Sequence, residues 1–219
     1  MSRLILAVDT TSEYGSVALL RDEQLLEEVL VHAPTGFSHV LYRYLAELLD
    51  RHGLRPDAID CFAAASGPGS FTGVRVGLAC VKGLAEGTGR PAVAVSNLQA
   101  VASFGTAPLR AAVLDARRGE VYGAVYDAAA RLVSPEVVAP LAAWIETLPA
   151  GELEFVSTDF TPFQAALAGT RFEQAPVCTA PRALAAAVAR LASRAAPQDP
   201  AALDANYVRR PDAELLWKG

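Results

Sequence analysis

The chain has 219 residues, and 52% of its side chains are hydrophobic, so it can bury a substantial core as one large domain or as two small ones. Its formal net charge of −5 argues against tight direct binding of a nucleic acid, because phosphate contacts need clustered Lys and Arg. The three cysteines are far apart among apolar residues, and we find neither a signal-peptide pattern nor an apolar run that could span a bilayer. We therefore expect a cytoplasmic protein with free thiols.

The first half of the chain predicts strands and helices in the order βββαβαβα. Three apolar runs separated by polar turns predict an antiparallel meander. After the meander, apolar residues recur at the helical period, and such stretches alternate with further apolar runs. The predicted strands cover 4–8, 16–20, 24–31, 61–65 and 92–95, and the predicted helices cover 38–52, 74–86 and 97–104.

The second half begins with the same pattern. The spacing from Asp9 to Asp22 is close to the spacing from Asp115 to Asp127, and each interval holds a strand, a turn and a second strand. We therefore predict a duplicated unit. The predicted strands cover 111–114, 121–126, 132–138 and 155–157, and the predicted helices cover 141–148, 163–167 and 182–195.

This duplication predicts an α/β fold built from two βββαβα-type units. We expect an N-terminal domain at 1–107 and a smaller, degenerate C-terminal domain with the C-terminal tail at 108–219. Two similar α/β domains in succession are typical of the actin, sugar kinase and Hsp70 (ASKHA) architecture.

The turn after the first strand is the first candidate site. Kinases of this architecture hold ATP phosphates with a turn of the type Asp-x-Gly-x-Thr/Ser, in which glycine lets the backbone approach the phosphate. Here the turn begins at Asp9, and Thr11 stands where the glycine would be, so its Cβ would crowd a phosphate. A hydrogen-bonded turn that closes the hairpin is favoured over a working nucleotide site.

The second candidate is the glycine-rich stretch 66–77, which enters a predicted helix. Its glycines allow positive φ, and the N–H groups at the helix start could hold an anion, although the P-loop lysine is missing. The alternative is a tight strand-to-helix turn with Ser70 or Thr72 as the N-cap. A degenerate nucleotide site would combine residues of both candidate segments: Asp9, Thr11, Gly67 and Gly69.

The helix predicted at 74–86 carries its charges on one narrow stripe and is otherwise apolar. Such a helix is covered on two sides, one by its own sheet and the other either by a partner helix or by more of the same chain. Pairs of glycines four residues apart would let another backbone come close. These pairs are Gly73 with Gly77 and Gly83 with Gly87.

Histidine is scarce, and the sequence predicts no metal site and no catalytic residues. His39 is followed four residues later by Arg43, so this helix lacks a pair of metal ligands. Ser-His-Asp, Gly-x-Ser-x-Gly and His-Glu-x-x-His patterns are also missing from the sequence, which argues against hydrolase chemistry.

Four segments together resemble the TsaB (YeaZ) family: 6–10, 66–77, 115–122 and 207–210. Their order and the chain length match the family along essentially the whole protein, although the half beyond Tyr126 matches less distinctively. The resemblance implies an ASKHA fold shared with a catalytic paralogue, TsaD, which transfers threonylcarbamoyl to the adenosine next to the tRNA anticodon. It also implies pairing with TsaD through the first two helices of the N-terminal domain, and binding of the ATPase TsaE by the heterodimer. TsaD carries a His-x-x-x-His metal pair where this chain has His39 and Arg43.

From this resemblance we expect a non-catalytic scaffold and activator of TsaD, with no cofactor, with tRNA contacted only through the complex, and with a possible homodimer in isolation. The expected partner interface consists of Leu41, Tyr44, Leu45, Leu48, Arg75, Leu78 and Lys82. Two alternatives are an ATP-binding kinase or carbamoyltransferase that uses Asp9 and the glycine-rich loop, and a peptidase that would depend on Ser70 or His39. The basic, aromatic tail at 207–218 is left open between tRNA, its own domain and TsaE.

Overall fold

The computed structural model describes residues 3–209. Its internal contacts divide the chain into two compact units, which we call unit 1 (Met1–Ala100 with Arg182–Asn206) and unit 2 (Val101–Pro181 with Tyr207–Gly219). The expected ranges 1–107 and 108–219 are corrected by this division, because the chain returns to unit 1 at Arg182. No helix in the described part of the chain is long and apolar enough to cross a membrane.

Unit 1 is built on a mixed five-stranded sheet with the strand order β3-β2-β1-β4-β5. The meander β1 to β3 is antiparallel, and β4 and β5 add to β1 in parallel. The strands are β1 (Leu4–Asp9), β2 (Tyr14–Arg21), β3 (Gln24–His32), β4 (Cys61–Ala65) and β5 (Ala92–Val95). The helices that belong to this part are α1 (Leu41–Arg51), η1 (Pro56–Ala58), α2 (Phe71–Thr88), α5 (Ala185–Arg194) and η3 (Pro200–Ala202), and α3 (Asn97–Ala102) leads into unit 2.

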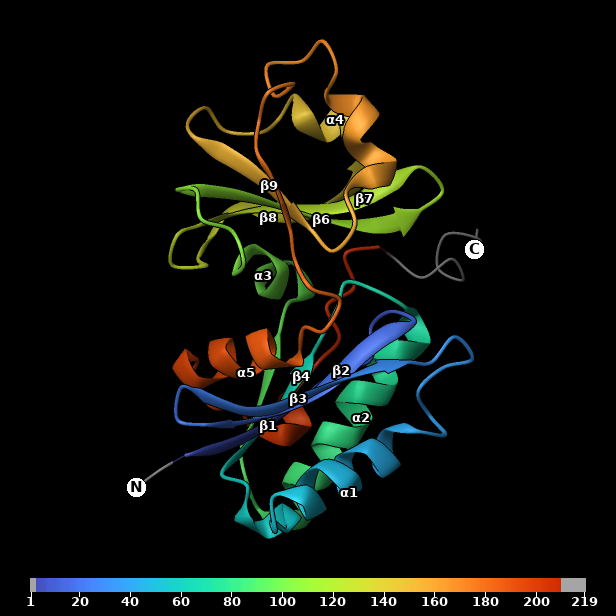
Figure 1. Cartoon of the computed structure of the whole chain (residues 1–219), viewed down its shortest axis with the longest axis vertical. Coiled ribbons are helices and arrows are strands. Elements are labelled where there is room, and N and C mark those ends of the chain that lie inside the picture. The colour runs from blue at the N-terminus through green and yellow to red at the C-terminus, as the bar shows by residue number, and fades with distance from the viewer. Residues whose placement is uncertain (1–2, 210–219) are drawn as a thin grey trace, which may run out of the picture. The chain divides into compact units, whose positions relative to one another are not determined.

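Helices cover both faces of this sheet. In Figure 1, α1 and α2 lie on one face and α5 lies on the other. Residues of β1 are buried in either direction: Leu6 and Val8 belong to the core under α1 and α2, and Ile5 and Ala7 are also fully buried. A strand that is buried on both faces has a continuous run of apolar residues, and for this reason β1 and β4 could be predicted from the sequence.

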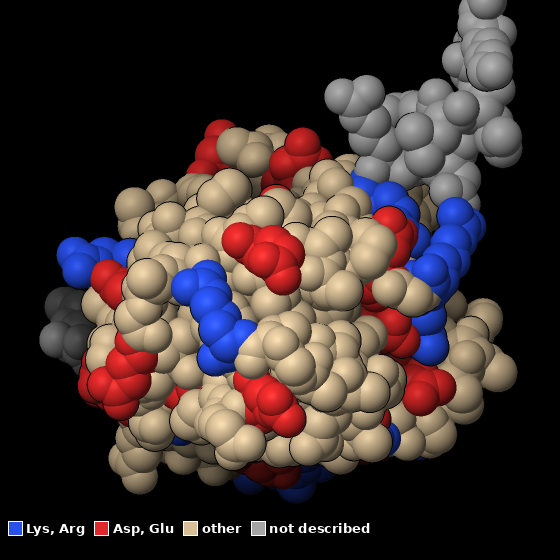
Figure 2. Space-filling model, turned by 90° about the horizontal axis from the view of Figure 1, so that it is seen from above, with Lys and Arg blue, Asp and Glu red and all other residues tan. Residues whose placement is uncertain are grey.

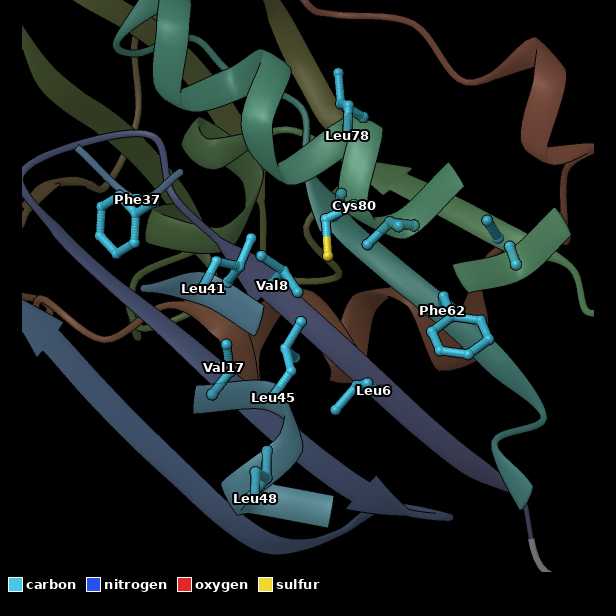
Figure 3. Packing of buried hydrophobic residues seen from close by; sticks show 14 of the residues in the cluster. Leu6, Val8, Val17, Phe37, Leu41, Leu45, Leu48, Phe62, Leu78 and Cys80 are labelled. Atoms are coloured by element: carbon cyan, nitrogen blue, oxygen red, sulfur yellow. The ribbon is translucent and has the colours of Figure 1, made fainter. Parts of the chain in front are cut away.

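The main core of unit 1 lies between the sheet and helices α1 and α2. Figure 3 shows side chains of α1, among them Leu41, Leu45 and Leu48, directed toward Leu6 and Val17 of the sheet. These leucines are at most 4% exposed, so α1 buries its whole apolar stripe inside its own unit. Burial of each such leucine is worth about 1.5–3 kcal/mol relative to exposure.

Helix α5 is capped by residues that are distant in the sequence. The Ser16 hydroxyl oxygen accepts hydrogen bonds from the N–H groups of Leu184 at 3.0 Å and Ala185 at 2.8 Å. Glu28 Oε1 accepts from the N–H of Ala186 at 2.8 Å. The free N–H groups of the first turn are thus satisfied by β2 and β3, which holds the alanine-rich helix against unit 1.

Unit 2 repeats the topology of unit 1. Its sheet has the order β10-β9-β6-β7-β8, which matches β5-β4-β1-β2-β3 with the same parallel and antiparallel pairs. The predicted duplication is therefore confirmed. The elements are β6 (Leu109–Arg117), β7 (Glu120–Asp127), β8 (Leu132–Pro140), α4 (Leu141–Ile145), β9 (Leu153–Ser157), η2 (Thr161–Leu167) and β10 (Val177–Thr179).

Two of the sequence predictions for this part need correction. The edge strand β10 was not predicted, because three residues of mixed polarity carry no periodic signal. The helix expected at 141–148 ends as an α-helix at Ile145, and its remaining buried residue, Leu148, follows in a turn. The core of unit 2 is formed around Trp144 and a group of phenylalanines, with the Phe155 and Phe160 rings 5.2 Å apart.

Candidate functional site

The turn between β1 and β2 is closed by hydrogen bonds within the chain. Asp9 Oδ1 accepts from the backbone N–H of Thr11 at 3.0 Å and from the Thr11 hydroxyl at 2.7 Å. The side-chain amide of Asn97, at the start of α3, donates to the Thr11 hydroxyl at 2.6 Å. Burial raises the pKa of Asp9, and the hydrogen bonds from Thr11 and Asn97 oppose that rise. The hydrogen-bonded turn favoured by the sequence is thus confirmed.

The glycine-rich loop packs directly on this turn. The N–H of Ser70 donates to the Thr11 carbonyl oxygen at 2.6 Å, and the Thr10 hydroxyl donates to the Gly73 carbonyl oxygen at 2.7 Å. A Cβ on Gly69 would lie 2.5 Å from the Thr11 carbonyl oxygen, and a Cβ on Gly73 would overlap the Thr10 carbonyl oxygen. Glycine is required at both positions because two backbones touch there.

The residues of the possible nucleotide site are therefore brought together, but by contacts with one another. Gly67 adopts φ of 104°, and its N–H donates to Asn97 Oδ1 at 2.9 Å. Its carbonyl oxygen accepts from the Asn97 backbone N–H at 2.8 Å, so Asn97 holds the loop and the turn together. The sequence left these glycines open between the approach of an anion and a tight strand-to-helix turn, and in the structure they allow one backbone segment to approach another.

The loop ends in the predicted N-cap of α2. The Ser70 side chain accepts a hydrogen bond from the Gly73 N–H at 3.3 Å, which confirms Ser70 rather than Thr72 as the cap. Ser70 is also the serine on which a peptidase would depend, and in the structure its side chain caps the helix. The helix closes at Gly89, which has φ of 66° as a left-handed C-cap.

The residues expected at the partner interface do not form one exposed face. Four of them are leucines buried in the core of unit 1, and Tyr44 packs against the same core. The four are Leu41, Leu45, Leu48 and Leu78. These four side chains are therefore not available to a partner in this structure, because they face the core of their own unit. Arg75 is exposed, and Lys82 is partly buried with Nζ 3.4 Å from the Ala201 carbonyl oxygen.

A different set of residues on these helices faces solvent. Tyr42 on α1 is 62% exposed, and Phe71 at the start of α2 is 43% exposed. Arg75, Ala79 and Gly83 follow at successive turns of α2 and are exposed. The Arg75 guanidinium carbon lies 3.6 Å from the centre of the Phe71 ring, a cation–π contact. We call these five residues the α1/α2 surface.

The α1/α2 surface is open at Gly83. A Cβ placed on Gly83 would have no neighbouring atom within 4 Å, so this turn of the helix is open. Small residues allow a second helix to approach closely, because interaxial distance depends on the side chains at the contact. On α2 the helical period separates these exposed residues from the buried stripe, whereas most of the residues expected at the interface belong to the apolar side of each helix.

Two of the histidines lie in local side-chain contacts. His52 and Arg51 both contact the carboxylate of Glu27 on β3, at 2.9 Å and 2.8 Å. His32 stacks on Tyr14, with ring centres 4.4 Å apart. Within residues 3–209, no three His, Cys, Asp or Glu side chains gather as a possible metal-binding group.

The basic tail is described only as far as Arg209, so Arg210, Trp217 and Lys218 lie outside the described residues. Arg209 forms an ion pair with Glu120 on β7, and its guanidinium carbon lies 5.9 Å from the centre of the Tyr122 ring. The described start of the tail thus packs on unit 2. On the face seen in Figure 2, Lys and Arg are interspersed with Asp and Glu, and neither sign dominates it.

Comparison with known proteins finds a matching family model and curated relatives of this chain. A family model described as TsaD, tRNA N6-adenosine threonylcarbamoyltransferase, matches residues 32–200. The tRNA threonylcarbamoyladenosine biosynthesis protein TsaB of Bacillus subtilis is 34% identical over 66% of this chain. The match covers 65% of that protein, so the chain spans somewhat less than two thirds of the length of this curated relative.

The duplicated sheets define an ASKHA-type protein, and component A of (R)-2-hydroxyglutaryl-CoA dehydratase from Acidaminococcus fermentans shares the fold. That structure has a TM-score of 0.51 and 12% identity, and the match covers 88% of this chain and 98% of the other. A Pseudomonas aeruginosa structure described as similar to peptidase YeaZ has a TM-score of 0.78 and 27% identity, over 94% of this chain and all of its own. The chain belongs to the TsaB (YeaZ) family.

Proposed function

We propose that this chain acts in the biosynthesis of threonylcarbamoyladenosine in tRNA, as a non-catalytic subunit that binds a TsaD-type catalytic paralogue. The name of the Bacillus subtilis relative and the TsaD family match support the pathway. In the same proposal, a TsaE-type ATPase binds the resulting heterodimer, tRNA is contacted through the complex, and the proteins meet in the cytoplasm.

The observation that carries the non-catalytic assignment is the contact between the β1–β2 turn and the glycine-rich loop. In an ASKHA kinase, the corresponding turn needs open backbone to receive phosphate. Here the Thr10 and Thr11 carbonyl oxygens lie against the loop, and the Asp9 carboxylate is buried under the Thr11 and Asn97 hydrogen bonds. A phosphate at this turn would have to displace these contacts.

The α1/α2 surface is the proposed site of contact with the paralogue. It replaces the buried leucines of the sequence-based interface, and it keeps Arg75 from that set. The surface combines two aromatic side chains and an arginine with small residues. This composition fits the general anatomy of interfaces, in which aromatic and Arg side chains anchor and small residues allow close approach. In the absence of the paralogue, the same surface would pair two copies of this chain.

A binding experiment tests this proposal. Ala79→Glu places a charge in the middle of the α1/α2 surface, and Ala129→Glu makes the same change at an exposed turn between β7 and β8. We expect Ala79→Glu to abolish co-purification with the TsaD-type protein of the same organism and to stop tRNA modification in a reconstituted mixture. Ala129→Glu should behave as wild type. Undiminished binding by Ala79→Glu would reject this surface.

A second measurement separates the subunit role from the kinase or carbamoyltransferase alternative. Calorimetric titration of the isolated chain with Mg-ATP should give no stoichiometric binding, because the Asp9 turn is engaged by the glycine-rich loop. Tight binding at one site per chain, lost on Asp9→Asn, would overturn the non-catalytic assignment.

A further inference from the structure

Unit 2 contains a groove of about 450 Å³ beside its first hairpin. The groove lies between the tip of the β6–β7 hairpin, the junction of β8 with α4, and η2. Arg117 and Arg118 border it from the hairpin, and apolar side chains line it from α4 and η2, among them Leu141, Phe163 and Ala166. Sites for small molecules usually have a volume of about 300–1,000 Å³ and combine an apolar lining with a few polar groups.

The equivalent place in unit 1, beside the β1–β2 hairpin, is filled by the chain itself. There the segment between β3 and α1 carries Phe37, which is 3% exposed and would collide with a Cβ on Gly15 of the hairpin. The glycine-rich loop after β4 packs on the turn of the same hairpin. In unit 2, α4 begins directly after β8, and the connection from β9 to η2 at 158–160 contains no glycine. The duplication therefore leaves a space beside the second hairpin where an aromatic ring lies beside the first.

The rim of the groove carries a net positive charge, because the described residues that line it include two arginines and one acid. The acid, Asp115, fixes the hairpin turn, since its Oδ1 accepts from the Arg117 N–H at 2.7 Å. Its Oδ2 lies 3.4 Å from a guanidinium nitrogen of Arg117, and the two side chains are 44% and 82% exposed. Such an exposed ion pair is weak, so the Arg117 guanidinium can take a second carboxylate. Arg118 is exposed beside it at the tip and adds a second cation.

We propose that this groove binds a small carboxylate that carries an apolar group of the size of an aromatic ring. The carboxylate pairs with Arg117 and Arg118, because a planar guanidinium matches a carboxylate with two parallel hydrogen bonds. The apolar group lies on the lining from α4 and η2, in the place that Phe37 takes in unit 1. This inference is independent of the proposed function, since the groove contains none of the residues of the α1/α2 surface.

Amide NMR of the full chain during titration with hydrocinnamate, a phenyl ring joined to a carboxylate by a short linker, tests the proposal. We expect saturable shifts of the resonances of Gly119 and Ala142, which line the groove from the hairpin and from α4, and no shift at Ala79 on the α1/α2 surface. Acetate has the charge without the ring, and hydrocinnamyl alcohol has the ring without the charge. Both should bind at least roughly tenfold more weakly, because each loses one of the two contacts.

Three outcomes of this titration would overturn the proposal. The first is the absence of saturable shifts with hydrocinnamate. The second is equal binding of acetate, which would reduce the site to an anion-binding hairpin. The third is equal binding of the alcohol, which would remove the arginines from the site.

Variants locate the two contacts. Arg117→Asn with Arg118→Asn should weaken hydrocinnamate binding at least roughly tenfold, because Asn tolerates positive φ but cannot pair with a carboxylate. Arg131→Asn, at an 80% exposed arginine of the β7–β8 turn, is the matched control and should bind as wild type. Ala142→Phe leaves both arginines in place and should abolish binding by filling the groove from α4. Wild-type affinity in either the double variant or Ala142→Phe would overturn the proposal, and an unchanged thermal midpoint shows that each variant is folded.

Discussion

Alanine substitutions at two glycines of α2, Gly77 and Gly83, should change the free energy of unfolding in opposite directions. Both glycines lie inside one helix, where alanine is favoured over glycine by about 1 kcal/mol. At Gly83 a new Cβ has no atom within 4 Å, so nothing opposes this gain. Gly83→Ala should therefore stabilise the chain by about 1 kcal/mol.

At Gly77 the same gain is outweighed by a collision. A Cβ there would lie 2.6 Å from the hydroxyl oxygen of Thr10, which donates to the Gly73 carbonyl oxygen at 2.7 Å in a buried site. Loss of that hydrogen bond costs about 1–3 kcal/mol when the hydroxyl stays buried, and overpacking adds about 1–3 kcal/mol. After the helical gain of about 1 kcal/mol is subtracted, Gly77→Ala should destabilise the chain by roughly 1–5 kcal/mol.

Urea denaturation of the wild type and both variants measures this difference, provided that all three share one m-value. A Gly77→Ala variant as stable as Gly83→Ala would refute the packing of α2 on the β1–β2 turn, and with it the physical basis of the non-catalytic assignment. A destabilised Gly83→Ala would instead show that this turn of the helix is covered in the isolated chain. Gly83→Leu extends the test, because it should retain the stability gain yet weaken binding of the paralogue.

Three further predictions follow from the described contacts. Ser16→Ala should lower the free energy of unfolding by about 1–2 kcal/mol in thermal denaturation, because two N–H groups of α5 lose their acceptor, and an unchanged midpoint would contradict the capping. The hydrogen bond from Arg51, with another from His52, lowers the pKa of Glu27 below its ordinary 4.5. The ionised Glu27 therefore stabilises the folded chain fully above pH 4.5, and this stabilisation is lost as the pH falls through the folded-state pKa. The stability difference between wild type and Glu27→Gln should accordingly be present at pH 7 and vanish at low pH, and a difference that grows on acidification would contradict the pairing. Burial raises the pKa of Cys80 to about 11, so mass spectrometry after brief native alkylation at pH 8 should find Cys178, which is partly exposed, modified before Cys80.

The duplicated architecture was accessible from the sequence because its signals are local. The buried runs of β1 and β4, the turns of both meanders and the Ser70 cap of α2 each depend on a few adjacent residues. The return of α5 to unit 1 was not accessible, because its caps are Ser16 and Glu28, more than 150 positions earlier in the chain. An alanine-rich helix carries no information about which sheet it will cover.

The burial of the leucines in the expected interface could not be predicted for a related reason. Periodicity identifies the apolar side of a helix but not whether that side faces the chain's own sheet or a partner. For α1, the stripe that contains Leu41 and Leu45 fills the core, and the exposed aromatic Tyr42 is offset from it by one residue. The same limit applies to Asn97, whose contacts with the β1–β2 turn span 86 positions and leave no trace in the local sequence.

The glycine-rich loop connects the closed β1–β2 turn to the proposed binding surface. In a phosphate loop, glycine lets backbone approach an anion, and here Gly69 and Gly73 let backbone approach the Thr10 and Thr11 carbonyl oxygens. That contact closes the turn and also fixes the first residues of α2, because the Ser70 N–H is bonded to Thr11. Phe71 and Arg75 begin the α1/α2 surface within the next two turns, so its orientation is set by the same hydrogen bonds. A change that reopened the turn would therefore loosen the start of α2. Under the proposed function, one contact both closes the turn to a phosphate and orients the surface that would bind the partner.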